Sequence, residues 1–170
     1  MITSDKYLQP SEHERLLQTL RIARYTDTRN ALMIELALRC GARASELLDL
    51  RKSDLKDDFE MVFIRGIKGS KDRDVALNSD FYKRLKEYAA GVDDLLFPIS
   101  YKRFHQIWHE YTPNPLKGIH SLRHTFAILF YEKTKDVLKL KRALGHVSLK
   151  NTMVYTEVRY SKEEMRKEAI

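Results

Sequence analysis

The chain has 170 residues, of which 43% are hydrophobic and 32% are charged, a composition that excludes a disordered protein and fits one globular domain. No apolar run approaches the ~20 residues of a membrane span, and the first residues lack the apolar stretch of a secretory signal. The net charge of +7 favours a polyanionic partner, because basic side chains displace the counterions of a nucleic acid.

The first third of the chain is predicted to be helical. Pro10, followed by a serine and a glutamate, marks a helix start, and leucines at helical spacing come after it. A second helix is predicted over residues 29–39 and stops at Gly41, and a short third helix begins near Ala44. Cys40 is the single cysteine, which excludes an intrachain disulfide and fits a reducing cytoplasm, and we expect it in the core.

A small sheet is predicted after these helices. Residues 61–64 (Met-Val-Phe-Ile) and 74–77 (Asp-Val-Ala-Leu) are rich in strand formers, and the turn between them carries glycines and cations. A third strand is predicted near residues 52–56. Helices resume over residues 80–90, 101–111, 121–133, 136–144 and 151–158. We therefore expect a mainly α-helical protein with a small three-stranded antiparallel sheet (α+β), in which Phe126 and Leu129 are core residues.

Two arginines lie where helices are predicted to begin. Arg43 precedes Glu46 in Gly-Ala-Arg-Ala-Ser-Glu-Leu (residues 41–47), where a forked guanidinium could meet phosphate oxygens while the glutamate orients it. The same two residues could equally form an ordinary surface ion pair three positions apart on a helix. His120 and Arg123 are one helical turn apart, which places an imidazole and a fixed cation near backbone amides suited to an anion.

A histidine and a tyrosine follow at a suggestive interval. His146 comes directly after a glycine at a predicted helix end, and Tyr155 lies nine residues later in Leu-Gly-His-Val-Ser-Leu-Lys-Asn-Thr-Met-Val-Tyr-Thr. Together with His-Ser-Leu-Arg-His-Thr-Phe-Ala at residues 120–127, this segment resembles the catalytic domain of the tyrosine recombinases, the phage-integrase and Xer-type family. The resemblance extends from about Leu8 to Val158.

This resemblance implies a set of catalytic residues and one supporting carboxylate, namely Arg43, Lys68, His120, Arg123, His146, the nucleophile Tyr155, and Glu46. The tyrosine would attack a DNA phosphodiester and form a 3′-phosphotyrosyl linkage, which a second 5′ hydroxyl religates. The arginines and His146 would hold the nonbridging oxygens. His120 would accept or shuttle the tyrosine proton, and Lys68 would protonate the departing 5′ oxygen.

Two of these assignments have alternatives. Lys71 could exchange roles with Lys68, because Ile67 separates the first glycine of the turn from that lysine and Ala76 replaces the usual proline. Tyr160, five residues after Tyr155, is the alternative nucleophile.

Histidine pairs raise the possibility of a metal site. His105 and His109 are four residues apart, as are His120 and His124, and this spacing can chelate zinc. Neither pair has the glutamate of a His-Glu-x-x-His motif, and the chain has no cysteine pair. The arginines supply the positive charge that the chemistry needs, so we expect no metal and no cofactor. For His124 we expect a structural role.

The resemblance implies double-stranded DNA as the partner. The candidate cations for its phosphates are Lys71, Arg73, Lys141, Arg142 and Lys150. We expect a monomer in solution, a tetrameric synapse on DNA that passes through a Holliday junction, and a place in the cytoplasm at the nucleoid.

The length bears on the organisation of the chain. Residues 1–170 leave no room for the N-terminal core-binding domain that family members carry, so we expect one catalytic domain. The C-terminal tail, with Met165, Ala169 and Ile170, could pack on its own core or on a neighbouring protomer. Two other functions stay open: a type IB topoisomerase-like enzyme that relaxes DNA, and a DNA-binding module that keeps the fold without the chemistry.

Overall fold

The structure is a computed structural model that describes residues 2–67 and 69–156. Within them the elements are, in chain order, α1 (Pro10–Ala23), α2 (Thr28–Cys40), α3 (Ala44–Leu48), a 3-10 turn (Lys52–Asp54), β1 (Leu55–Lys56), β2 (Met61–Ile64), β3 (Arg73–Ala76), α4 (Ser79–Ala89), α5 (Tyr101–Tyr111), α6 (His120–Thr134), α7 (Val137–Leu144) and α8 (Lys150–Met153). The predicted fold class, mainly helical with a three-stranded antiparallel sheet, is confirmed.

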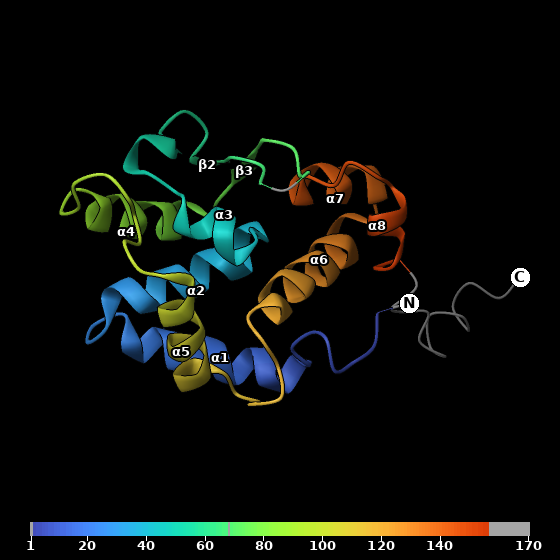
Figure 1. Cartoon of the computed structure of the whole chain (residues 1–170), viewed down its shortest axis with the longest axis horizontal. Helices are drawn as coiled ribbons and strands as arrows, with labels where there is room; N and C mark the ends of the chain where they lie inside the picture. Colours follow the sequence, from blue (N-terminus) through green and yellow to red (C-terminus); the bar gives the residue numbers. More distant parts are fainter. Residues whose placement is uncertain (1, 68, 157–170) are drawn as a thin grey trace, which may run out of the picture.

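Helix α2 is the centre of the fold. Almost every side chain from Asn30 to Leu38 is buried, because α1, α3, α4 and α6 all pack on this helix. A helix that is apolar on nearly all sides needs such neighbours around it. Cys40 at its end is fully buried, as predicted. Figure 1 shows α2 among these helices, with the strands and α4 on one side and α6 on the other.

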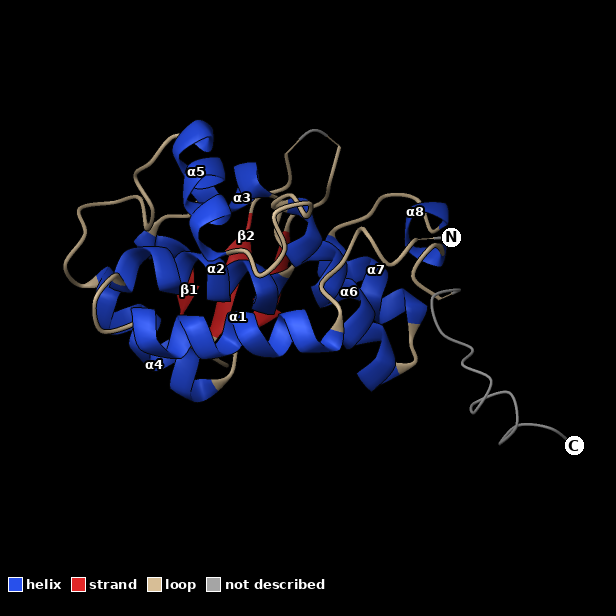
Figure 2. Ribbon diagram, turned by 90° about the horizontal axis from the view of Figure 1, so that it is seen from below, coloured by secondary structure: helices blue, strands red, loops and turns tan. Residues whose placement is uncertain are grey.

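The sheet is small and has the order β1-β2-β3, with both pairs antiparallel. Figure 2 shows its strands in red among the helices. Val62 of β2 pairs with Leu55 on one side and Val75 on the other, and all three side chains are buried. Because side chains alternate along a strand, Arg73 shares the inward face of β3 with Val75 and is buried too.

A second, smaller core lies between α6 and the last helices. It consists of Tyr7, Phe126, Ala127, Ile128, Leu140, Leu144 and Tyr155. Helices α6, α7 and α8 lie together at one end of the molecule (Figure 1). The proposed nucleophile therefore belongs to the packing of this core, and its ring is fixed by apolar neighbours.

Most predicted elements agree with the structure to within one or two residues. The third strand differs more, because residues 52–54 of the predicted range 52–56 form a 3-10 turn and β1 covers only Leu55–Lys56. Helix α8 ends at Met153, although we predicted a helix over 151–158, and the part of that prediction after residue 156 lies outside the described residues. Leu129, predicted to be core, is 42% exposed, so that prediction is wrong. No helix in residues 2–67 and 69–156 has the length and apolarity needed to cross a bilayer.

Candidate active site

One buried carboxylate, that of Glu46, contacts the side chains of three arginines. Glu46, in the first turn of α3, accepts a hydrogen bond from the backbone N–H of Arg43 and lies 3.2 Å from its guanidinium. Its other guanidinium contacts are Nη2 of Arg73 at 2.8 Å and Nη1 of Arg123 at 3.9 Å. One carboxylate cannot neutralise all of these guanidinium groups, so the cluster keeps an excess of positive charge. Arg43 has the most exposed side chain of the cluster, at 32%.

Arg123 is the buried member of this cluster, and hydrogen bonds fix its position. Its guanidinium donates to the carbonyl oxygens of Gly41, at 2.6 Å, and Leu144, at 2.8 Å. Both carbonyls lie where a helix ends in a left-handed glycine, Gly41 after α2 and Gly145 after α7. The two glycine motifs noted in the sequence thus converge on one arginine. Burial, with the charges of Arg43 and Arg73, lowers the pKa of Arg123 to about 10, which still leaves it protonated at neutral pH.

His146 is oriented by a buried hydroxyl. Its Nδ1 lies 2.9 Å from Oγ1 of Thr152, which is fully buried at the start of α8. Burial and the charges of Arg123 and Arg43 lower the pKa of His146 to about 4, so the ring is neutral at pH 7. If the threonine hydroxyl donates to Nδ1, the ring proton stays on Nε2, which is then available as a donor to an anion. The sequence reasoning did not assign this role to Thr152.

Tyr155 lies beside the arginines with little access to solvent. Its side chain is 4% exposed, and its hydroxyl is 2.8 Å from Nδ1 of His124. Burial raises the pKa of Tyr155, while the charges of Arg123 and Arg43 act in the opposite direction. His124 directly follows Arg123 in α6, so this contact brings the phenol to the turn of the helix that carries the arginine. The contact to His124 is a second relationship that the motifs alone did not identify.

His120 begins α6 on the solvent side of the same cluster. It is exposed, and its ring centroid is 4.7 Å from that of His124, in an edge-on arrangement. Although the residue is accessible to solvent, the protein atoms around the imidazole displace part of its water and lower its pKa, and the charges of Arg123 and Arg43 act in the same direction. The structure therefore brings together all of the described residues that the resemblance implied to be catalytic, with Glu46 in contact with both arginines: Arg43, His120, Arg123, His146 and Tyr155. Lys68 and the alternative nucleophile Tyr160 lie outside the described residues.

The turn that carries Lys68 is anchored to this cluster through its described neighbours. Ser70 donates its hydroxyl to Glu46 at 2.5 Å, and the backbone N–H of Lys71 donates to the carbonyl of Gly145 at 2.9 Å. The α-carbon of Gly145 faces this turn so closely that a Cβ there would lie 2.6 Å from the carbonyl oxygen of Lys71. These contacts hold the β2–β3 turn against the end of α7.

The predicted DNA-contacting cations separate into two groups. Lys71, Arg142 and Lys150 are exposed and Lys141 is partly exposed, so their side chains reach solvent. Arg73 is buried, and it donates Nε to the carbonyl of Ala143 at 2.8 Å besides its ion pair with Glu46. The prediction that Arg73 contacts DNA is therefore wrong, because its guanidinium is committed inside the protein.

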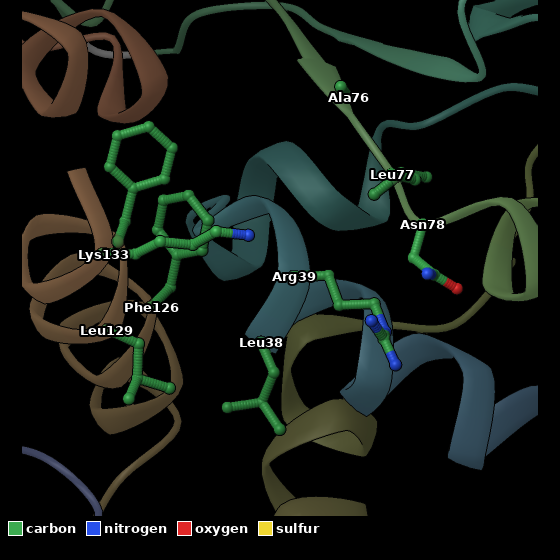
Figure 3. A pocket seen from close by; sticks show the side chains of 9 residues that line it. Leu38, Arg39, Ala76, Leu77, Asn78, Phe126, Leu129 and Lys133 are labelled. Carbon is green, nitrogen blue, oxygen red and sulfur yellow. The ribbon is translucent and has the colours of Figure 1, made fainter.

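A metal-binding group and a small-molecule pocket are two other kinds of site that the side chains could form. Among the residues that the structure describes, no group of three histidine, cysteine or acidic side chains could hold a metal ion. A pocket of about 320 Å³ lies between the end of α2, the residues after β3, and α6 (Figure 3). Arg39, Asn78, Leu129 and Lys133 are among its lining residues. None of the described catalytic candidates lines it, and it explains why Leu129 is exposed.

The sequence is similar to curated tyrosine recombinases. It is 34% identical over 166 residues to a tyrosine recombinase of Pseudothermotoga lettingae, an alignment that covers 89% of this chain and 56% of the relative. It is 29% identical over 169 residues to tyrosine recombinase XerH of Campylobacter jejuni, with 89% and 48% covered. The chain thus spans about half the length of these curated relatives.

Solved structures of recombinases and of an integrase are similar to this fold. XerA recombinase superposes with a TM-score of 0.75 at 25% identity and covers 95% of this chain and 61% of that protein. The catalytic domain of bacteriophage HP1 integrase gives a TM-score of 0.69 at 26% identity, with 95% and 93% covered. XerH bound to a palindromic difH substrate gives a TM-score of 0.72 at 28% sequence identity, and the superposition covers 97% of this chain and 52% of XerH. The profile of the phage integrase family matches residues 6–162, and the chain belongs to this family.

Proposed function

We propose that this chain is the catalytic part of a site-specific DNA recombinase, which cleaves and rejoins DNA through a 3′-phosphotyrosyl linkage without a metal or cofactor. The observation that carries the proposal is the contact of the Tyr155 hydroxyl, at 2.8 Å, with His124, the residue next to Arg123 in α6. A phenol next to a cluster of guanidinium groups with excess positive charge is suited to attack an anionic phosphodiester.

The cluster would bind the phosphodiester in two layers. Arg43, whose side chain is partly exposed, would meet a nonbridging oxygen first, with Glu46 fixing its direction. Arg123 lies beneath it and is already held by the carbonyls of Gly41 and Leu144, so little reorganisation is needed when charge develops on the phosphate. His146 would add a donor from Nε2. Removing one such donor typically costs ~10²–10³-fold in rate.

Cleavage would then proceed by in-line displacement. The oxygen of Tyr155 forms a bond to phosphorus, and the bond from phosphorus to the 5′ oxygen breaks. That oxygen takes a proton from the acid that we assign to Lys68, and the phosphate remains attached to the tyrosine. Attack by a second 5′ hydroxyl reverses these steps on a new strand, so ligation requires no ATP. Two rounds of this exchange would pass through a Holliday junction.

DNA is the partner that fits the surface of the chain. XerH, with which this chain shares 28% identity, has been crystallised with its difH substrate. The exposed cations Lys71, Arg142 and Lys150, with the partly exposed Lys141, would meet the backbone phosphates of a duplex. We propose a monomer in solution that assembles as a tetramer on DNA, at the nucleoid.

The test uses nicked duplexes that trap a covalent protein–DNA adduct. Substrates carry the DNA that flanks the gene or a randomised core, and adducts are counted by gel shift under denaturing conditions. We expect the intact chain to form an adduct and Tyr155→Phe to form none. An adduct of equal yield with Tyr155→Phe would overturn Tyr155 as nucleophile and point to Tyr160. Relaxation of supercoiled plasmid without strand exchange would show a topoisomerase-like enzyme, and salt-sensitive binding without any adduct would show a binding module.

A further inference from the structure

The hydroxyl of the proposed nucleophile is bound by a histidine that the family resemblance did not place in the catalytic set. Nδ1 of His124 lies 2.8 Å from Oη of Tyr155, and the ring centroids are 5.7 Å apart at an interplanar angle of 47°. The two residues are 31 positions apart in sequence. His124 lies one turn after His120 on α6, whereas Tyr155 follows α8, so the contact joins two elements of the site.

The chemistry of the contact limits its direction. A neutral imidazole accepts at one ring nitrogen and donates at the other, and a neutral phenol can donate its proton or accept through its oxygen. Burial, followed by the charges of His120 and Arg123, lowers the pKa of His124 to about 4, so this ring is neutral at pH 7. The phenol of Tyr155 keeps its proton because burial raises its pKa. With both partners neutral, the phenol can donate to Nδ1 when His124 carries its own proton on Nε2, and this arrangement leaves Nδ1 free to take the phenol proton.

We propose that His124 is a catalytic residue of this chain, which orients the hydroxyl of Tyr155 and takes its proton as the oxygen attacks phosphorus. The proposal rests on the proposed function of Tyr155 as the nucleophile. It assigns the first proton acceptor to the ring that touches the reacting oxygen, and leaves His120, on the exposed side, to exchange protons with solvent.

The proton balance of the reaction is closed within the site. In cleavage the proton passes from Tyr155 Oη to His124 Nδ1 while the bond from Oη to phosphorus forms, and the departing 5′ oxygen receives its proton from the acid. In religation the acid, deprotonated by the first step, takes the proton of the attacking 5′ hydroxyl, and the imidazolium of His124 returns its proton to the phenol as the phosphotyrosyl bond breaks. No oxidant, metal or other reagent is needed.

The neutral state of the His124 ring in the unbound protein leaves Nδ1 able to accept a proton. The charges of Arg123 and Lys6 add to burial in disfavouring an imidazolium, as do His120 and His146 when they are protonated. A phosphodiester bound by the arginines brings a negative charge to the same place and opposes that effect. The ring is thus kept neutral, and able to accept a proton, until the substrate arrives.

Two substitutions separate orientation from proton transfer. In His124→Asn the side-chain amide oxygen can reach the position of Nδ1 and accept the phenol hydrogen bond, but it cannot take the proton. In His124→Ala both functions are lost, and the space left can admit imidazole from solution. General bases typically contribute ~10²–10⁴-fold, so we expect His124→Ala to form the adduct ~100-fold or more slowly than wild type at saturating nicked duplex. His124→Asn should fall between the two.

Chemical rescue distinguishes a base from a structural residue. We expect imidazole and its substituted derivatives to accelerate His124→Ala in order of their basicity, and to leave His124→Asn unchanged. Urea unfolding of both variants reports whether they fold. Adduct formation by folded His124→Ala within about threefold of wild type would overturn the proposal, and so would a large loss without any rescue, since that result indicates a packing role.

A measurement on the protein without DNA makes the contact testable even if no duplex gives an adduct. In ¹⁵N NMR spectra of the histidines, Tyr155→Phe should shift the Nδ1 signal of His124 toward that of a free acceptor. Tyr88→Phe, whose hydroxyl bonds the carbonyl of Leu96 instead, is the matched control and should leave it unchanged. An unaltered His124 signal in Tyr155→Phe would refute the His124 proposal alone. Lack of any adduct with an intact His124 signal would refute only the proposed function.

Discussion

Arg73 and Glu46 form an ion pair that is sealed from solvent, with 2.8 Å between Nη2 and Oε2 and side chains that are 4% and 0% exposed. Arg73 also donates to the carbonyl of Ala143, so the pair connects β3, α3 and α7. These three elements position the β2–β3 turn, Arg43 and His146. The pair therefore positions groups for which we propose contact with the phosphate, although both of its members are buried.

Replacing Glu46 with glutamine should destabilise the fold markedly. Removal of one partner of a buried ion pair leaves an uncompensated charge and typically costs about 3–5 kcal/mol, and here the guanidinium of Arg73 would be left in that state. Urea unfolding followed by circular dichroism measures the loss. Glu110→Gln is the control, because its pair with Arg103 is solvent-exposed at 3.7 Å and should contribute less than about 1 kcal/mol. Equal effects for the two variants would contradict the role assigned to the buried pair.

The same pair should make stability depend on pH in acid. Burial alone would raise the pKa of Glu46, but the hydrogen bond and charge of Arg73, with the hydroxyl of Ser70, outweigh it and lower the pKa to about 2 from an ordinary value of 4.5. A depressed carboxyl pKa contributes stability that is complete above the unfolded value and is lost as the pH falls through the folded value. The free-energy gap between wild type and Glu46→Gln should thus narrow from pH 5 toward pH 2. A gap independent of pH would show that the glutamate charge is not stabilising.

Much of the fold could be predicted from sequence periodicity, and one misplaced strand boundary explains the main error. Residues 73 and 75 lie on the same buried face of β3, and residue 77, directly after the strand, is buried as well; two of these three residues are apolar. The sequence predicts a strand that begins at residue 74, which places Arg73 in the turn as a cation for DNA. The strand begins one residue earlier, so Arg73 points inward, where a buried arginine needs a carboxylate partner and finds Glu46.

The remaining differences depend on long-range packing that local spacing does not encode. Phe126 and Leu129 are three residues apart on one face of α6, which favours burial of both. Phe126 packs against Gly41, whereas Leu129 faces the pocket beside α2 and stays open to solvent. Likewise, nothing in the segment around His124 indicates that a tyrosine 31 residues later will reach its ring. Motif resemblance located the cluster, but only the folded chain shows which ring touches the hydroxyl.

Gly145→Ala should damage both stability and catalysis. Gly145 has a φ of +66°, and a Cβ there would lie 2.6 Å from the carbonyl oxygen of Lys71 and 2.9 Å from Nη1 of Arg73. The left-handed backbone alone costs an ordinary residue about 1–2 kcal/mol, and the close contacts add to it. We expect the free energy of unfolding, measured in urea, to fall by about 2 kcal/mol or more. Adduct formation should also be slower, because His146 is displaced. The control is Gly91→Ala, where the nearest atom is 3.6 Å away; a similar loss there would remove the explanation.

The exposed cations should give DNA binding a steep salt dependence. If about six phosphates are neutralised, the logarithm of affinity should fall against the logarithm of salt concentration with a slope of about −5. Arg142→Ala should make that slope shallower by about 1, as expected for the loss of one phosphate contact. Lys83 is exposed on α4, away from α7 in Figure 1, and Lys83→Ala should leave the slope unchanged. Fluorescence anisotropy with duplex DNA over a salt series measures all three, and a flat response would contradict a phosphate-dominated footprint.

The choice between Lys68 and Lys71 as the acid can be decided by the leaving group. A sulfur in place of the bridging 5′ oxygen departs as a thiolate and needs little protonation, since thiols are far stronger acids than alcohols. The Lys68→Ala variant should therefore cleave ordinary DNA ~100-fold or more slowly than wild type. The same variant should cleave the sulfur-substituted duplex at nearly the wild-type rate.

Lys71→Ala should behave differently with the same two substrates. The Lys71 side chain is exposed, while its backbone N–H is tied to Gly145, so its loss should weaken binding and leave the rate at saturating DNA close to wild type on both duplexes. If the sulfur substrate rescued Lys71→Ala and not Lys68→Ala, the acid would be Lys71. The proton would then come from the residue whose backbone is anchored beside His146, and the arginine cluster and its nucleophile would keep the roles proposed for them.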